Sequence, residues 1–151
     1  MTDIADLICE YRANPQGIDV TSPRLGWAMK TERHGARQAA YQVFAAADPD
    51  RLISGQSDLW DSGRVESDES LHVVYRGKPL QSRQRVYWKV TVWDEEGAVA
   101  QSDPAWFEMG LLSKDDWQAQ WIGAELAGGA YSMIPAPYLR CLLYTSDAAD
   151  E

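Results

Sequence analysis

The sequence contains few of the residues on which metal, disulfide or nucleic-acid sites depend. Its 151 residues include two cysteines, two histidines, and 14 Lys and Arg against 23 Asp and Glu. The formal charge of −9 argues against the clustered basic surface that nucleic-acid binding requires. Cys9 and Cys141 indicate no disulfide framework, and neither His34 nor His72 has a Cys or carboxylate at ligand spacing. We expect no metal, no cofactor and no nucleic-acid partner.

Long apolar runs are also lacking. No stretch approaches the roughly 20 residues that a membrane-spanning helix needs. The start of the chain, MTDIADLICEYRANP, has neither the basic first part nor the apolar core of a signal peptide. We therefore expect a cytoplasmic protein without a membrane partner.

The dominant pattern in the sequence is two-residue alternation of apolar and polar side chains. In VYWKVTVWD, residues 86–94, Val86, Trp88, Val90 and Val92 face one way and the residues between them face the other. This alternation is typical of half-buried antiparallel strands. Turn sequences such as NPQG, DSG and DEEG separate the runs. Strands are expected near residues 4–10, 24–31, 38–46, 58–61, 70–75, 85–94 and 104–110.

Two short helical turns are expected between and after these strands. Asp48-Pro49 has the residue types of an N-cap and first helical position, and Ser113 is a plausible N-cap in SKDD. About seven short strands at this spacing, with no long helix, predict an all-β protein. The expected fold is an immunoglobulin-like β-sandwich of Greek-key type.

Candidates for hydrolytic chemistry are sparse. The carboxylates within residues 66–69 and 94–96 lie in or beside turns, which favours solvated loop charges. A Ser–His–Asp triad can be written from Ser70, His72 and Asp68, but no nucleophile elbow or oxyanion hole accompanies it. We predict no catalytic residue in this chain.

The aromatic residues offer a more specific candidate site. Tyr87 and Trp93 lie on the face opposite Trp88, and Trp106 joins them if strands 85–94 and 104–110 pair. Exposed aromatics can stack on sugar rings, which would make this face a carbohydrate-binding surface. Alternatively, they pack against the C-terminal tryptophans or another domain. Large exposed apolar patches usually mark interfaces, which favours packing.

Several blocks, in order, resemble the N-terminal part of bacterial α-L-rhamnosidases of glycoside hydrolase family 78. The first is DIADLICEYRANPQGIDVTSPRLGWAM (3–29), and others are RQAAYQVFAA (37–46), YWKVTVWDEEG (87–97) and DDWQAQWIG (115–123). The resemblance implies a fibronectin type III-like β-sandwich over residues 1–110 and a connector packed on it over 111–128. It also implies the start of a truncated second β-domain at 129–140.

In that family, catalysis belongs to a later (α/α)6 barrel with carboxylate acid and base, and no residue of this chain corresponds to it. The resemblance therefore implies a non-catalytic, structural domain. Its partners would be the missing C-terminal domains of the same polypeptide and a rhamnosylated glycan. The alternatives are a carbohydrate-binding module and a free-standing interaction domain.

The last eleven residues, CLLYTSDAADE (141–151), depart from the charged-apolar strand that the resemblance implies after PAPYLR. A polar linker is one interpretation. We favour another, because these residues can be encoded by the transposon-end adaptor of sequencing libraries read through in frame. Any other codon choice in the coding DNA would contradict this interpretation. Without the three acidic residues of the segment, the net charge changes from −9 to −6.

Overall fold

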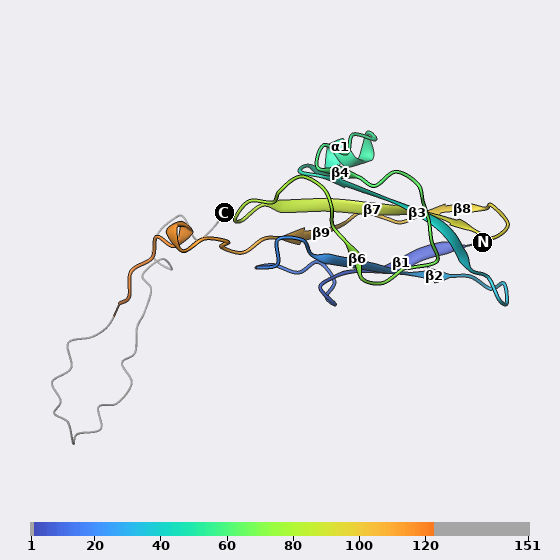
Figure 1. Cartoon of the computed structure of the whole chain (residues 1–151), viewed down its shortest axis with the longest axis horizontal. Coiled ribbons are helices and arrows are strands. Elements are labelled where there is room, and N and C mark those ends of the chain that lie inside the picture. Colours follow the sequence, from blue (N-terminus) through green and yellow to red (C-terminus); the bar gives the residue numbers. More distant parts are fainter. Residues whose placement is uncertain (1, 123–151) are drawn as a thin grey trace, which may run out of the picture. The chain divides into compact units, whose positions relative to one another are not determined.

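The computed structural model describes residues 2–122, and the chain up to Trp117 forms one folded unit. Two antiparallel sheets lie face to face in this unit (Figure 1). The smaller sheet has the order β1-β2-β6, with β1 Asp3–Cys9, β2 Arg24–Lys30 and β6 Val73–Val74. None of the helices in the described part is long and apolar enough to cross a membrane.

The larger sheet is built around two long central strands, β3 (Gln38–Ala46) and β7 (Arg85–Asp94). These strands pair antiparallel along most of their length. On one side β3 pairs with β4 and β5, and on the other β7 pairs with β8 and β9. The bounds of the outer strands are β4 Trp60–Asp61, β5 Val65–Glu66, β8 Val99–Gln101 and β9 Ala105–Glu108.

The predicted β-sandwich is confirmed, but the strand list needs correction. The described residues contain nine strands, and β5 and β8 were not predicted. Both are only two or three residues long and pair with one neighbour each, so they leave little alternation to detect. The strand predicted over 70–75 shortens to β6, because His72 adopts a left-handed backbone with φ of 60°.

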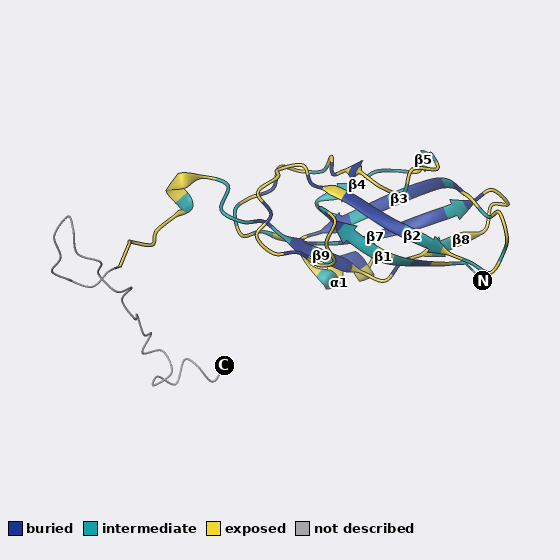
Figure 2. Cartoon of the chain, turned by 90° about the horizontal axis from the view of Figure 1, so that it is seen from below, coloured by how far each residue is buried: buried dark blue, intermediate teal, exposed yellow. Residues whose placement is uncertain are grey.

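The core fills the space between the sheets, as the alternation predicted. Val86, Trp88 and Val90 on β7 are fully buried, and Tyr41 and Val43 on β3 join them. Figure 2 shows buried residues along the central strands, with exposed residues concentrated in the loops. The inward face of each central strand therefore holds the two sheets together.

Both predicted helical turns are present. The helix α1 (Pro49–Ile53) begins at Asp48, whose carboxylate accepts a hydrogen bond from the Asp50 amide at 2.8 Å. It contacts β3 and β7, on the side of the large sheet away from the small sheet (Figure 1). A 3-10 turn, η1 (Lys114–Asp116), begins at Ser113 with a capping box. The predicted second β-domain (129–140) and the tail (141–151) lie outside the described residues.

Candidate functional site

The predicted aromatic residues all lie on the outer face of the large sheet, the face turned away from the small sheet. On β7, Tyr87 and Trp93 alternate with fully buried residues, and each is itself only half-buried. Trp106 on β9 is half-buried too, and the register places it directly opposite Tyr87. The structure thus brings Tyr87 and Trp106 together as a cross-strand pair.

A cation lies over Trp106, one member of this aromatic pair. The Arg85 guanidinium is 4.4 Å from the centroid of the Trp106 ring, within the range of a cation–π contact. The same guanidinium is held by Glu108 on β9, with an Arg85 Nη2 to Glu108 Oε2 distance of 2.8 Å. Hydrogen bonds to Tyr87 and Glu108 raise the pKa of Arg85 above its ordinary value, so the cation persists throughout the physiological range.

Trp93 is separated from this pair. It lies six residues from Tyr87 along β7, which corresponds to about 20 Å at roughly 3.4 Å per residue. Arg64 lies over the Trp93 ring, with its guanidinium 4.7 Å from the ring centroid. Arg64 also forms an ion pair with Glu66. The structure therefore does not bring Trp93 together with the other two aromatics.

This arrangement differs from a bare aromatic platform. A guanidinium over a ring competes with a sugar for that face. Between the two aromatic positions lie polar residues, among them Gln42 and Thr91, which are paired in the sheet register. Near α1, the face is occupied by the Leu52 side chain, which is fully buried. The outer face is mixed in polarity and already internally paired, as is usual for surfaces between domains.

The triad that can be written from Ser70, His72 and Asp68 is not assembled. Residues 67–72 form no strand, and the His72 ring nitrogen Nε2 is 3.0 Å from the hydroxyl of Tyr11 rather than near a serine. Among the described residues, no group of three His, Cys, Asp or Glu is placed to hold a metal ion.

The two carboxylate clusters behave differently from each other. Glu66, Asp68 and Glu69 are exposed, in agreement with the prediction of solvated charges. For Asp94 that prediction was wrong, since the residue is only 5% exposed. Its carboxylate accepts hydrogen bonds from the amides of Glu96 and Ala98 and pairs with Arg33 at 2.8 Å. Asp94 thus shapes the β7–β8 turn.

Cys9 has no reactive character. It is buried in the core and makes no disulfide. Burial raises its pKa to about 12, with a further contribution from the neighbouring Glu10 carboxylate. A thiol with such a pKa stays protonated at neutral pH and is a poor nucleophile.

A polar cluster after β1 was not predicted from the sequence. Glu10 and Tyr11 both have left-handed backbones, and the Glu10 carboxylate binds Arg24 through both oxygens, at 2.7 and 3.1 Å. Arg24 also lies over the Tyr11 ring at 5.0 Å, and Tyr11 contacts His72. The side-chain hydrogen bond from Arg24 lowers the pKa of Glu10. Positive φ values at non-glycine residues have no simple sequence signal, so this turn was missed.

A second unpredicted cluster ties down the chain that leaves β9. The Ser82 hydroxyl donates to the Asp116 carboxylate and accepts from the Leu112 amide at 2.8 Å. The same carboxylate accepts from the Ser113 amide at 3.0 Å. These hydrogen bonds, with that from Ser82 first, lower the pKa of Asp116. We call Ser82, Leu112, Ser113 and Asp116 the exit clasp, because they attach residues 112–116 to the loop before β7.

Comparison with known proteins matches this sandwich to a family. Residues 4–113 match the family model of the Rha78A-like, N-terminal immunoglobulin domain. The chain belongs to this family. It is 45% identical over 116 residues to an α-L-rhamnosidase of Streptomyces avermitilis, which covers 76% of this chain and 11% of the relative. It is 38% identical over 122 residues to one from Formosa agariphila, covering 80% of this chain and 13% of the relative.

Solved structures of rhamnosidases contain the same fold. The crystal structure of the Streptomyces avermitilis α-L-rhamnosidase complexed with L-rhamnose matches with a TM-score of 0.77 at 42% identity, over 82% of this chain and 12% of that chain. The α-L-rhamnosidase from Dictyoglumus thermophilum matches with a TM-score of 0.76 at 32% identity, over 81% and 14%. This Rha78A-like immunoglobulin domain thus spans about one-eighth of the relatives it matches.

Proposed function

We propose that this Rha78A-like domain is a non-catalytic part of an α-L-rhamnosidase that supports and orients the other domains of the same polypeptide. The observation that carries the proposal is coverage, because the chain matches its relatives along most of its own length but only 11–14% of theirs. The described residues offer no catalytic triad and no metal cluster. Hydrolysis of terminal α-L-rhamnose would then belong to residues that correspond to the remainder of the relatives.

The exit clasp supports a structural role. A linker that only tethers two domains needs no attachment to either of them. Here the segment after β9 is bound through side chains on both sides, Ser82 from the sandwich and Asp116 from the segment. These hydrogen bonds fix residues 112–116 against the sandwich.

A domain exchange tests the proposal directly. In the Streptomyces avermitilis relative, the 116 aligned residues would be replaced by the aligned residues of this chain or be deleted. We expect the exchange to retain soluble expression and hydrolysis of an aryl α-L-rhamnoside, and the deletion to lower the melting temperature or the yield of folded enzyme. If the deletion variant is as stable and active as the parent, the supporting role is wrong.

The 151-residue chain alone is the second arm of this test. We expect no hydrolysis of an aryl α-L-rhamnoside by the purified chain, because the chain corresponds to only 11–14% of the length of its rhamnosidase relatives. Turnover that co-purifies with the chain through several columns would contradict a non-catalytic assignment.

Binding of a rhamnosylated glycan to Tyr87, Trp93 and Trp106 is the second candidate. The position of Tyr87 directly opposite Trp106 favours this binding. The guanidinium over each tryptophan and the distance of Trp93 from the other two aromatic residues disfavour it. Saturable glycan binding that is lost in Trp106→Ala but kept in Trp93→Ala would support a site at the Tyr87–Trp106 pair.

A further inference from the structure

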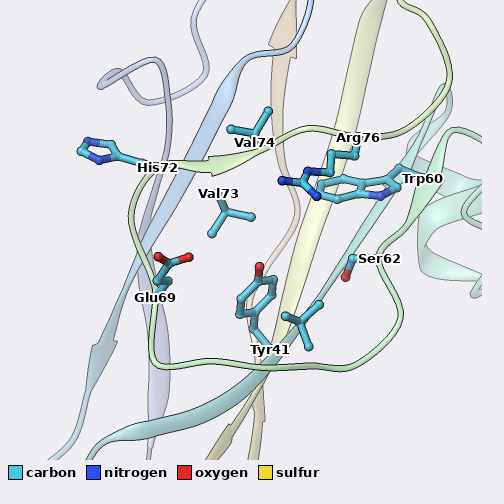
Figure 3. A pocket seen from close by; sticks show the side chains of 9 residues that line it. Tyr41, Trp60, Ser62, Glu69, His72, Val73, Val74 and Arg76 are labelled. Atoms are coloured by element: carbon cyan, nitrogen blue, oxygen red, sulfur yellow. The ribbon is translucent and has the colours of Figure 1, made fainter.

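A pocket opens at the edge of the sandwich, on the inner side of the large sheet and so on the side of β3 opposite the aromatic outer face. It lies where β6 of the small sheet faces β4 and β5 at the edge of the large sheet (Figure 3). Its volume is about 380 Å³, within the range of roughly 300–1,000 Å³ that small-molecule sites occupy. Val65, Val73 and the Trp60 side chain form apolar parts of its wall.

Three polar side chains of the pocket have no protein partner. The Tyr41 hydroxyl, the Glu69 carboxylate and the Arg76 guanidinium make no hydrogen bond or ion pair within residues 2–122. Glu69 and Arg76 are exposed, whereas Tyr41 is only 8% exposed. Figure 3 shows the Tyr41 hydroxyl directed into the pocket, with Glu69 and Arg76 on different sides of it. Although most of the Tyr41 side chain is buried, its hydroxyl oxygen is open to the pocket, so a ligand can reach it.

The segment that carries Glu69 is held in place by a buried amide. Gln38 accepts a hydrogen bond from the Trp27 indole at 2.8 Å and donates to the carbonyls of Ser67 and Glu69 at 3.1 and 2.7 Å. Gln38 is 7% exposed, so these hydrogen bonds are shielded from water. The backbone at Glu69 is therefore fixed, while its carboxylate stays free to bind.

The three groups have complementary hydrogen-bonding roles. A carboxylate only accepts, a guanidinium only donates, and a tyrosine hydroxyl does both. An anion would be attracted by Arg76 but repelled by Glu69, and a cation the reverse, so the pocket favours neither charge. A hydroxyl group can satisfy each of the three side chains. The apolar wall fits the C–H face of a ring. The chemistry of the pocket thus matches a neutral polyhydroxylated ring.

We propose that the pocket between β6 and the β4–β5 edge binds one neutral sugar unit through Tyr41, Glu69 and Arg76. This site is separate from the aromatic outer face and does not depend on the supporting role proposed for the domain. It adds a ligand contact in a part of the chain to which no chemistry is otherwise assigned. A single ring held by a few hydrogen bonds is a weak ligand, so we expect a Kd on the order of 1–10 mM.

The test is a titration of the ¹⁵N-labelled 151-residue chain, followed by amide chemical shifts. The probes are L-rhamnose and D-galactose, and glycine is the control ligand. Glycine matters because its ammonium and carboxylate groups would match Glu69 and Arg76 separately, without any hydroxyl chemistry. We expect saturable shifts with at least one sugar, centred on residues 60–76, and none with glycine.

Substitutions assign the contacts. Glu69→Gln and Tyr41→Phe should each weaken sugar binding about fivefold to tenfold, as expected for loss of one hydrogen-bonding group. The matched control is Glu66→Gln, an exposed acid at the end of β5 that is already paired with Arg64, and it should leave the affinity unchanged. Glu69 is exposed, so Glu69→Gln should fold even if Tyr41→Phe does not.

Several results would overturn the proposal. One is the absence of a saturable shift with either sugar up to about 100 mM, which is well above the expected Kd. Another is binding of glycine but of neither sugar. A third is sugar binding that the Glu69→Gln substitution leaves unchanged. Shifts centred on Trp93 or Trp106 would also overturn it, because they would place the sugar on the outer face instead.

Discussion

The two faces of β7 carry aromatic residues in different settings. On the inner face, Trp88 is fully buried between valines that are also fully buried. On the outer face, Tyr87 and Trp93 are half-buried among charged and polar neighbours, with arginines over Trp93 and Trp106. The same strand thus presents an apolar packing surface on one side and a mixed, hydrogen-bonded surface on the other.

The difference separates residues that pack between the two sheets from residues on the outer side of the large sheet. The inner face gains its stability from burial of apolar area and needs no particular partner beyond the opposite sheet. The outer face keeps its aromatics covered by cations, which reduces exposed apolar area while the chain is alone. Such a face can meet a polar partner domain without exposing a large apolar patch beforehand.

The largest expected effect compares Trp88 with Trp93, two tryptophans of the same strand. Trp88→Ala should lower the free energy of unfolding by about 3–5 kcal/mol, because it leaves a large cavity in the core. Trp93→Ala should cost less than about 1 kcal/mol, since the ring is already partly in water. Urea unfolding of both variants, followed by far-UV circular dichroism, measures the two values. Equal losses would mean that the outer face is packed as tightly as the core.

A smaller effect is expected from the Glu10–Arg24 pair, which lies outside the core on the small sheet. The folded state lowers the pKa of Glu10, so the pair's stabilisation is present above the ordinary carboxyl pKa and is lost as pH falls through the lowered value. Glu10→Gln should therefore cost up to about 1 kcal/mol at pH 7 and progressively less below about pH 4.

Chemical unfolding of both proteins at pH 7 and at acid pH checks this dependence. Asp6→Asn is a suitable control, because the Asp6–Lys30 pair on the same sheet is far more exposed, at 65% and 57% for the two side chains. A pH-independent loss for Glu10→Gln would show that the backbone turn, and not the ion pair, contributes the stability.

The smallest effect concerns the cation over Trp93. Arg64→Ala should change the free energy of unfolding by no more than about 0.5–1 kcal/mol, the range of exposed cation–π contacts. It should nevertheless shift the Trp93 indole resonance in a ¹⁵N–¹H spectrum, because the ring loses its cover. The indole resonance of the buried Trp88 should stay in place. A large loss of stability would instead assign Arg64 a role in the fold.

Much of the sandwich could be predicted because its main strands are long and regular. In β7 the inward residues Val86, Trp88, Val90 and Val92 are apolar and alternate with partly exposed or polar residues, so alternation alone identifies the buried face. The caps of α1 and η1 were predictable for a similar reason, since Asp48 and Ser113 each accept from the amide two residues away. Short edge strands such as β5 lack enough residues for a pattern to show.

The candidate site was only partly predictable. Alternation placed Tyr87, Trp93 and Trp106 on one face, but their spacing and the arginines over them depend on pairing between strands. Asp94 looked like an exposed turn residue, yet Arg33 reaches it from 61 positions earlier in the chain. No pattern in the residues near Asp94 indicates that Arg33 pairs with it.

By itself the sequence determined the strand pattern, the helix caps and the resemblance to one family, because these depend on neighbouring residues and on ordered blocks along the chain. Only the tertiary structure decided which polar groups are satisfied. Gln38 meets Trp27 and the Glu69 segment, while Tyr41, Glu69 and Arg76 meet at the sandwich edge from separate segments. Contacts between distant segments follow from how two sheets stack, and no periodicity along the chain encodes that.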